Sequence, residues 1–250
     1  MKKAVVLSGG GARCLAQVGY LGVLKKWGIE FDAFSGSSAG AIVSSLFAKG
    51  MEAEEILEFV KSIDFKRVIK FNFFKNSVFK MDKVLDIFYE KELYDFNLSK
   101  KLFVCVTDLD TYEPLYIDRG DLGKFLLASC SLIPLFDVCK IDSKKYIDGG
   151  FTDNLPVTPL LDYDFILALN VNPILKIKES FFKNFYLAAF IMLNANIKFS
   201  KERADKFVEF KECGKYSILD RKNFDEIYQI GVREAKKERD FWMAFKDGEL

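Results

Sequence analysis

The chain has 250 residues, half of them hydrophobic and 26 of them phenylalanine, which suits one large domain with a sizeable core. Its net charge of +1 gives no reason to expect nucleic acid as a partner. There is no histidine, which excludes a Ser-His-Asp triad, a Cys-His pair and any histidine-bound metal. Five scattered cysteines without a C-x-x-C spacing argue against a disulfide framework or a zinc site and fit a reducing interior. We therefore expect no metal and no other cofactor.

The first predicted element is a buried strand, Lys3 to Ser8, which a glycine loop over residues 9–13 follows at once. A helix is then expected over Cys14 to Trp27. A strand, a glycine loop and a helix in this order can present backbone N–H groups to a phosphate or an oxyanion. A dinucleotide is disfavoured, because its fingerprint needs glycine where Cys14 stands and no P-loop is present. A glycine turn that only tightens the junction remains an alternative.

The second stretch is Gly36-Ser37-Ser38-Ala39-Gly40, which reads as G-x-S-x-G. It lies between an expected strand end at residues 31–35 and an expected helix over residues 41–49. This context predicts a tight strand-to-helix turn that lifts the Ser38 hydroxyl into a cleft, with Gly36 and Gly40 leaving room that a Cβ would take. The pattern alone also fits an ordinary glycine-rich turn with a helix-capping serine.

A helix is expected over Met51 to Ile63, and an unusual segment, Phe65 to Met81, comes next. It carries five basic residues and no acidic one, interleaved with phenylalanines. That composition suits peripheral contact with an anionic membrane surface. The alternative is a helical cover whose phenylalanines join the core while its lysines face water.

The remaining elements alternate between strands and helices. Helices are expected over 82–89 and 121–129, strands over 101–107, 115–117 and 165–171, and a hairpin over 138–147. The apolar residues within Ser180–Ser200 predict a core helix or a lid, and charged helices are expected over Lys198–Glu212 and Asp225–Phe245. This order predicts an α/β fold with three layers, α/β/α, around a largely parallel sheet. We expect a main domain over residues 1–200 and a C-terminal helical extension over residues 201–250, packed on the same domain.

With no imidazole in the chain, the base for Ser38 must be a carboxylate or a lysine. Asp148 stands out, because it ends the second hairpin strand and is followed by Gly149 and Gly150. Those glycines allow close approach of the backbone and leave the carboxylate uncrowded. An ordinary Asp-Gly turn is the alternative.

Three blocks of the sequence resemble, in order and spacing, the signature blocks of the patatin-like phospholipases. They are Leu7 to Arg13, Gly36 to Gly40 and Asp148 to Gly150. Three intervening segments are also similar, namely Thr107 to Thr111, Ala128 to Pro134 and Asp153 to Val157. The resemblance covers about residues 3 to 172.

The resemblance implies a patatin-like domain with a Ser-Asp dyad, in which Ser38 is the nucleophile and Asp148 is its base. It further implies an oxyanion loop of Gly9, Gly10 and Gly11, steadied by Arg13. The family usually has glycine where this chain has Cys14, and often histidine where it has Gln17, which puts the detailed shape of the loop in question. A base of ordinary aspartate pKa is weak, so Asp148 is expected to gain basicity from burial.

The implied activity is hydrolysis of lipid esters, in phospholipids, lysophospholipids or neutral esters, through an acyl-enzyme and without a metal. Two alternatives remain: a soluble esterase or thioesterase that does not engage membranes, and an inactive lipid-binding module of the same fold. The N-terminal apolar run is too short for a signal peptide, and no run of 18 apolar residues predicts a membrane span. We therefore expect a cytoplasmic protein with peripheral contact at the inner membrane surface through Phe65–Met81. Nothing in the sequence sets an oligomeric state.

Overall fold

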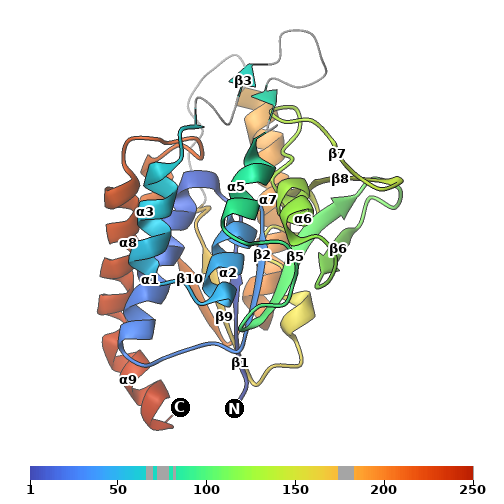
Figure 1. Ribbon diagram of the computed structural model, residues 1–250. Helices are drawn as coiled ribbons and strands as arrows, with labels where there is room; N and C mark the ends of the chain where they lie inside the picture. Colours follow the sequence, from blue (N-terminus) through green and yellow to red (C-terminus); the bar gives the residue numbers. More distant parts are fainter. Residues whose placement is uncertain (66–69, 72–78, 81–82, 174–182, 250) are drawn as a thin grey trace.

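The computed structural model describes residues 1–65, 70–71, 79–80, 83–173 and 183–249 (Figure 1). One sheet of eight strands organises this part of the chain, in the order β10-β9-β1-β2-β5-β8-β7, with β6 beside β5. These strands are β1 (Lys3–Leu7), β2 (Ala33–Ser37), β5 (Lys101–Asp108), β6 (Pro114–Ile117), β7 (Cys139–Ile141), β8 (Lys144–Asp148), β9 (Phe165–Asn170) and β10 (Lys206–Glu209). The five strands from β10 to β5 run parallel, whereas β6, β7 and β8 run antiparallel to their neighbours. The α/β prediction is confirmed, and the sheet is mixed but mostly parallel.

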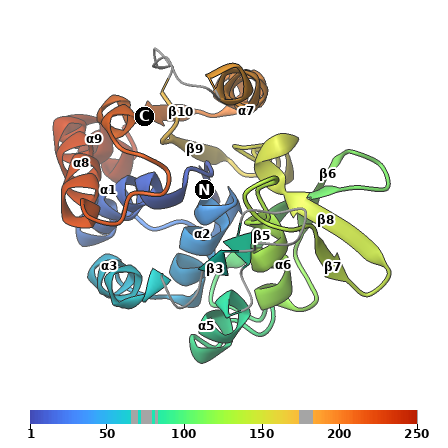
Figure 2. The same ribbon diagram turned by 90° about the horizontal axis from the view of Figure 1, so that it is seen from above.

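Helices cover both faces of the sheet (Figure 2). They are α1 (Leu15–Lys26), α2 (Ala39–Lys49), α3 (Ala53–Ser62), α5 (Val84–Glu90), α6 (Leu122–Ser129), α7 (Lys183–Arg203), α8 (Phe224–Lys237) and α9 (Arg239–Asp247). The strand β1 shows why two layers are needed, since its alternate side chains serve different cores. Val5 and Leu7 join the large core under α1, α2 and α8, while Ala4 and Val6 join a smaller core that includes Ile197 of α7.

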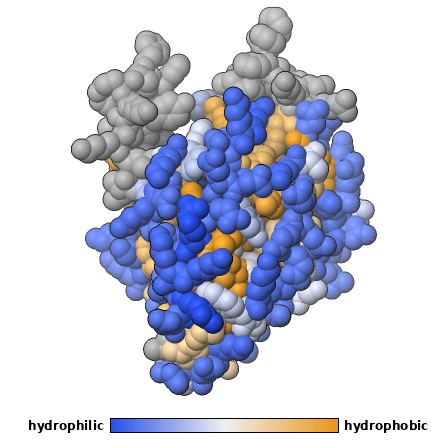
Figure 3. All heavy atoms as spheres, turned by 90° about the vertical axis from the view of Figure 1, so that its left-hand side faces the viewer, coloured by the Kyte–Doolittle hydropathy of each residue, from blue (hydrophilic) through white to orange (hydrophobic). Residues whose placement is uncertain are grey.

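The C-terminal part of the chain joins the same sheet and the same large core. The helix α8 lies against α1, and a Cβ at Gly231 would come within 1.8 Å of the Ala16 carbonyl oxygen, so the two backbones touch. The buried side of α8 carries Phe224, Ile227 and Ile230, and its charged residues face outward. Figure 3 shows this side of the molecule, on which hydrophilic residues cover most of the surface and hydrophobic ones show in a narrow band.

The prediction of one charged helix over Lys198–Glu212 is wrong. The helix α7 ends at Arg203, and β10 pairs in parallel with β9. The reason is that Phe207 and Val208 pack on opposite faces of the sheet, a period of two that the surrounding lysines and glutamates obscure. The carboxylate of Asp205 also accepts a hydrogen bond from the Ile166 amide at 2.7 Å, which fixes the start of the strand.

The expected membrane-contact segment, Phe65 to Met81, lies largely outside the described residues. Only Phe65 and two short strands, β3 (Lys70–Phe71) and β4 (Phe79–Lys80), belong to the described part. The Phe65 ring packs against Phe224 with a centroid distance of 6.1 Å. No helix in the described part of the chain has the length and hydrophobicity that a membrane crossing needs.

Candidate active site

Ser38 lies at the carboxyl end of β2, where the chain turns into α2. Its backbone has φ 52° and ψ −131°, a conformation that L-residues rarely adopt and that costs on the order of 1–3 kcal/mol. The turn is also crowded: a Cβ at Gly40 would lie 2.5 Å from the Ser8 carbonyl oxygen, and one at Gly36 would lie 2.6 Å from the Gly40 carbonyl. The glycines of G-x-S-x-G therefore supply the room that the motif predicts.

The hydroxyl of Ser38 donates a hydrogen bond to Asp148 Oδ2 at 2.7 Å. The two residues are 110 positions apart, and β5 brings them together because it lies between β2 and β8. Ser37 pairs with Cys105 of β5, and Asp148 pairs with the next residue, Val106. The register of two strand pairs thus places both side chains at the same level of the sheet.

Burial sets the electrostatics of Asp148. Asp148 is 3% exposed, and the only hydrogen-bond partners of its carboxylate among the described residues are the Ser38 hydroxyl and the Gly150 amide, which donates to Oδ1 at 2.8 Å. Burial raises the pKa of Asp148 to about 7, and the two hydrogen bonds lower it only in part. A carboxyl group with this pKa can accept a proton near neutral pH, which an aspartate of ordinary pKa does poorly.

The glycine loop lies directly beside Ser38. A Cβ at Gly9 would come within 2.9 Å of Ser38 Cβ. The Gly9 amide donates to the Asn154 carbonyl at 3.2 Å, and the Ala12 amide donates to the Ile218 carbonyl at 2.9 Å. The amides of Gly10 and Gly11, which lie between Gly9 and Ala12 in the chain, have no hydrogen-bond acceptor within the described residues. Two free N–H donors next to a serine form the arrangement that can hold an oxyanion.

Arg13 and Cys14 complete the loop. The Arg13 side chain is buried and its Nε donates to the Tyr216 carbonyl at 2.8 Å, so it ties the loop to a C-terminal segment. The Cys14 thiol contacts the Ser8 carbonyl at 3.4 Å, and burial raises the pKa of that thiol well above its usual range. Cys14 therefore fits at the position where the family usually has glycine, as a neutral buried donor.

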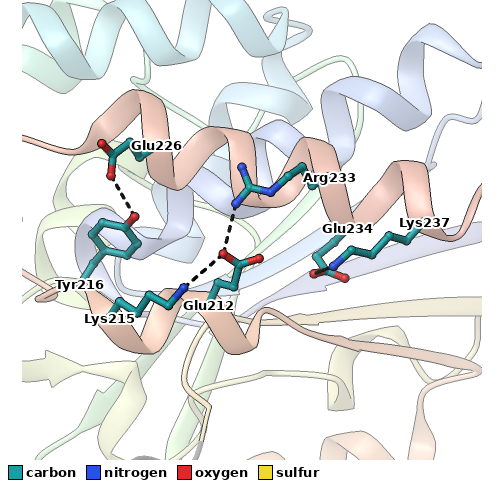
Figure 4. Close-up of polar contacts among 7 residues, drawn as sticks. All are labelled: Glu212, Lys215, Tyr216, Glu226, Arg233, Glu234 and Lys237. Carbon is teal, nitrogen blue, oxygen red and sulfur yellow. Dashed lines mark hydrogen bonds and ion pairs between the residues drawn. The ribbon is translucent and has the colours of Figure 1, made fainter.

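The segment that holds Arg13 is itself tied to α8. Figure 4 shows the Tyr216 hydroxyl pointing to Glu226 of α8, with a hydrogen bond of 3.0 Å, and Glu212 reaching both Lys215 and Arg233. These surface contacts are individually weak, because water screens them. Two of them, Tyr216 with Glu226 and Glu212 with Arg233, join the segment to α8, which packs on α1 directly after the glycine loop.

Sequence reasoning missed three polar contacts around these residues. Ser129 Oγ accepts a hydrogen bond from the Ser38 amide at 2.8 Å. Gln17 Nε2 donates to the Ser8 and Leu169 carbonyls, each at 3.0 Å. Asn172 Nδ2 donates to the Gly9 carbonyl at 2.6 Å. The signal that could have found Asn172 is its position just after a buried parallel strand, since side chains there gather at the site edge of the sheet.

An apolar cavity of about 250 Å³ opens beside Ser38. Its lining comes from α2, α3, α5, the loop after α6 and the C-terminal segment, and includes Ile42, Val43, Phe59, Val60, Ile63, Phe65, Phe88, Leu132, Phe136, Ile218 and Phe224. The thiol of Cys130 also lines it next to Ser38, and burial raises the pKa of that thiol. Among the described residues, no three acidic or cysteine side chains lie close enough together to hold a metal ion.

A mixed sheet with a serine at the turn from β2 to α2, faced by a buried carboxylate and a glycine loop, defines a patatin-like α/β protein. The family model described as Patatin-like phospholipase matches residues 5–161. The chain therefore belongs to the patatin-like phospholipase family, as the sequence blocks indicate.

Relatives and a solved structure agree with this assignment. The chain is 27% identical over 183 residues to lysophospholipase nte1 of Aspergillus oryzae, covering 68% of this chain and 12% of that protein. It is 25% identical over 279 residues to lysophospholipase nte1 of Aspergillus terreus, covering 93% of this chain and 18% of that protein. The chain thus spans less than a fifth of the length of these relatives. The crystal structure of VipD from Legionella pneumophila has the same fold, with a TM-score of 0.62, 14% identity, and coverage of 96% of this chain and 66% of that one.

Proposed function

We propose that the protein is a serine acyl hydrolase that cleaves carboxylic esters of lipids through an acyl-enzyme, with Ser38 as nucleophile and Asp148 as base. The observation that carries this proposal is the 2.7 Å hydrogen bond from Ser38 Oγ to a buried carboxylate whose pKa is raised to about 7. A carboxylate that can take a proton near neutral pH is what a serine needs as a base when the chain has no imidazole.

In the first half of the reaction, Asp148 takes the proton of the Ser38 hydroxyl while Oγ attacks the ester carbonyl carbon. The negative charge that develops on the carbonyl oxygen is held by the free amides of Gly10 and Gly11. Loss of one such donor typically costs about 3–4 kcal/mol of barrier. The tetrahedral intermediate then collapses, the bond to the alcohol oxygen breaks, and Asp148 returns its proton to the departing alcohol.

In the second half, Asp148 takes a proton from water, whose oxygen attacks the acyl-serine. The same two amides hold the second oxyanion. Collapse breaks the bond to Ser38 Oγ, which recovers the proton from Asp148, and the fatty acid leaves. Every proton transfer in this cycle uses one carboxylate, and no step calls for a metal.

The apolar cavity supports a lipid substrate. Each buried methylene contributes about 0.8 kcal/mol, so an acyl chain in this cavity binds far more strongly than a short acid does. The relatives in Aspergillus are named lysophospholipases, which supports substrates of the phospholipase A or lysophospholipase type. A short-chain esterase or thioesterase would leave most of the cavity unused.

A covalent probe tests the assignment of the nucleophile. A fluorophosphonate should label the wild type at Ser38 and leave Ser38→Ala unlabelled, and labelling at any other serine would contradict the proposal. Ser37→Ala is the matched control, because the Ser37 hydroxyl is buried without a hydrogen-bond partner in the described part of the chain. That variant should keep both labelling and hydrolysis.

A substrate panel tests the class of ester. Purified protein is incubated with lysophosphatidylcholine, phosphatidylglycerol, a monoacylglycerol, a fatty acyl thioester and p-nitrophenyl acetate, and the released acids are identified. Preference for the long-chain oxygen esters is expected. Preference for the acetate or the thioester would favour the soluble esterase or thioesterase, and labelling without turnover of any ester would favour a binding module.

A further inference from the structure

Two carbonyl groups of the oxyanion loop, those of Gly9 and Gly10, accept hydrogen bonds, whereas the Gly10 and Gly11 amides have no acceptor among the described residues. Asn172 Nδ2 donates to the Gly9 carbonyl oxygen at 2.6 Å, and the Arg13 amide donates to the Gly10 carbonyl oxygen at 3.3 Å. Both contacts lie on the side of the loop away from its unpaired N–H groups. The first is a close, buried hydrogen bond between two neutral groups, and the second is slightly longer than the usual range of about 2.7–3.2 Å.

Peptide geometry gives these contacts a consequence. In a trans peptide unit the C=O of one residue and the N–H of the next point in opposite directions. The Gly9 carbonyl and the Gly10 amide belong to one such unit. A group that fixes the direction of the Gly9 C=O therefore also fixes the direction of the Gly10 N–H. Because Gly9, Gly10 and Gly11 have no Cβ to restrict φ and ψ, the loop itself does little to keep these planes from rotating.

Asn172 is well placed to supply that restraint. It lies just beyond β9, the neighbour of β1 in the sheet, and the residue is 4% exposed. Its backbone N–H donates to Asn170 Oδ1 at 3.0 Å, and Asn170 Nδ2 in turn donates to Glu209 of β10 at 3.2 Å. The backbone that carries the Asn172 carboxamide is therefore held from β9 and β10 before any substrate arrives, and preorganised groups are the effective ones in catalysis.

From these contacts we infer that Asn172 is a positioning residue, which aims the Gly10 N–H at the oxyanion by holding the Gly9 carbonyl. The inference rests on the proposed function. It adds a residue beyond the stretch that the family model matches, which ends at residue 161. Asn172 touches neither the substrate nor Ser38 in this scheme, and it acts only through the loop.

Two variants test the role. Asn172→Ala removes the donor, and Asn172→Asp keeps the shape but turns an oxygen toward the Gly9 carbonyl. Each should lower kcat roughly 10- to 100-fold with KM nearly unchanged, because the lost interaction acts in the transition state; outright loss of an oxyanion donor costs 10²–10³-fold. Fluorophosphonate labelling of Ser38 in the same samples reports separately on the proposed nucleophile.

The decisive readout compares an ester with its thionoester, in which sulfur replaces the carbonyl oxygen. Sulfur accepts hydrogen bonds poorly, so the wild type should hydrolyse the ester much faster, and the ratio of the two rates should fall in both Asn172 variants. Ile197→Ala is the control for general destabilisation, since Ile197 packs in the smaller core, whose members include no residue of the loop. It should leave the ratio unchanged.

Unchanged turnover in either folded variant would overturn the role of Asn172. So would equal losses for the ester and the thionoester, or a change confined to KM. If wild-type Ser38 were not labelled and no ester were cleaved, the proposed function itself would fail, which is a different result.

Discussion

Replacing Asp148 with asparagine keeps the shape of the side chain and removes a charge that the fold buries. Raising the carboxyl pKa from 3.8 to about 7 makes the ionised form about 4 kcal/mol less stable in the folded protein than in the unfolded chain. That figure already includes the hydrogen bonds from Ser38 and Gly150, which favour the charge. Asp148→Asn should therefore stabilise the protein while it abolishes hydrolysis.

The raised pKa of Asp148 also makes the stability of the wild type depend on pH. Because the pKa is higher in the folded state, the folded protein binds more protons between about pH 4 and 7, and wild-type stability falls as the pH rises through that window. The asparagine variant has no such loss. The difference in unfolding free energy between the two proteins should be near zero below pH 4 and reach about 4 kcal/mol above pH 7, less about 1 kcal/mol if the new amide hydrogen-bonds poorly.

Urea unfolding of both proteins at pH 4.5, 6 and 8 measures this difference, with equal m-values as the condition for comparing them. Taking the difference at each pH cancels all other titrating groups. Asp153→Asn is a second check, since burial raises the pKa of Asp153 to about 6 and its window should end about one pH value lower. A pH-independent difference, or a variant less stable than the wild type at pH 8, would refute the reasoning.

Three further outcomes are expected. The double variant Ser38→Ala/Asp148→Asn should hydrolyse esters little more slowly than either single variant, because residues that act as one unit are not additive; substantial activity in Asp148→Asn would instead favour a lysine base. Val43→Phe should fill part of the cavity and lower kcat/KM for long-chain esters by roughly 30-fold, about 2 kcal/mol, with p-nitrophenyl acetate unaffected. Glutamine at Lys66, Arg67, Lys70 and Lys75 should reduce sedimentation with phosphatidylglycerol vesicles and leave soluble-ester hydrolysis unchanged; equal binding would reject a surface role for Phe65–Met81.

The sequence predicts the parts of the site that are encoded in short contiguous motifs. Ser38, Asp148 and Gly9 each follow or end a strand, and their neighbours have to be small for local steric reasons that leave a trace in the sequence. What the motifs do not contain is the distance between Ser38 and Asp148. That distance depends on the pairing of β5 with two other strands, which is a property of the whole sheet.

The C-terminal contributions are harder to predict for a physical reason. The loop contacts from this part of the chain are made by the backbone carbonyls of Tyr216 and Ile218. Any residue supplies a carbonyl, so no side-chain identity marks these positions. The strand β10 is hard to predict for a different reason: it has only four residues, and its charged neighbours have helical spacing.

Three costly features meet at one edge of the sheet: the strained backbone of Ser38, the buried charge of Asp148 and the two unpaired amides of Gly10 and Gly11. Each opposes folding, and each is what the proposed chemistry requires, since a relaxed serine turn, a solvated carboxylate or a paired amide would be inert. The stability that offsets them has to come from elsewhere. The contact of α8 with α1, directly behind the glycine loop, buries apolar side chains and is well placed to supply it, so the C-terminal part of the chain both holds the loop and contributes stability that offsets these costs.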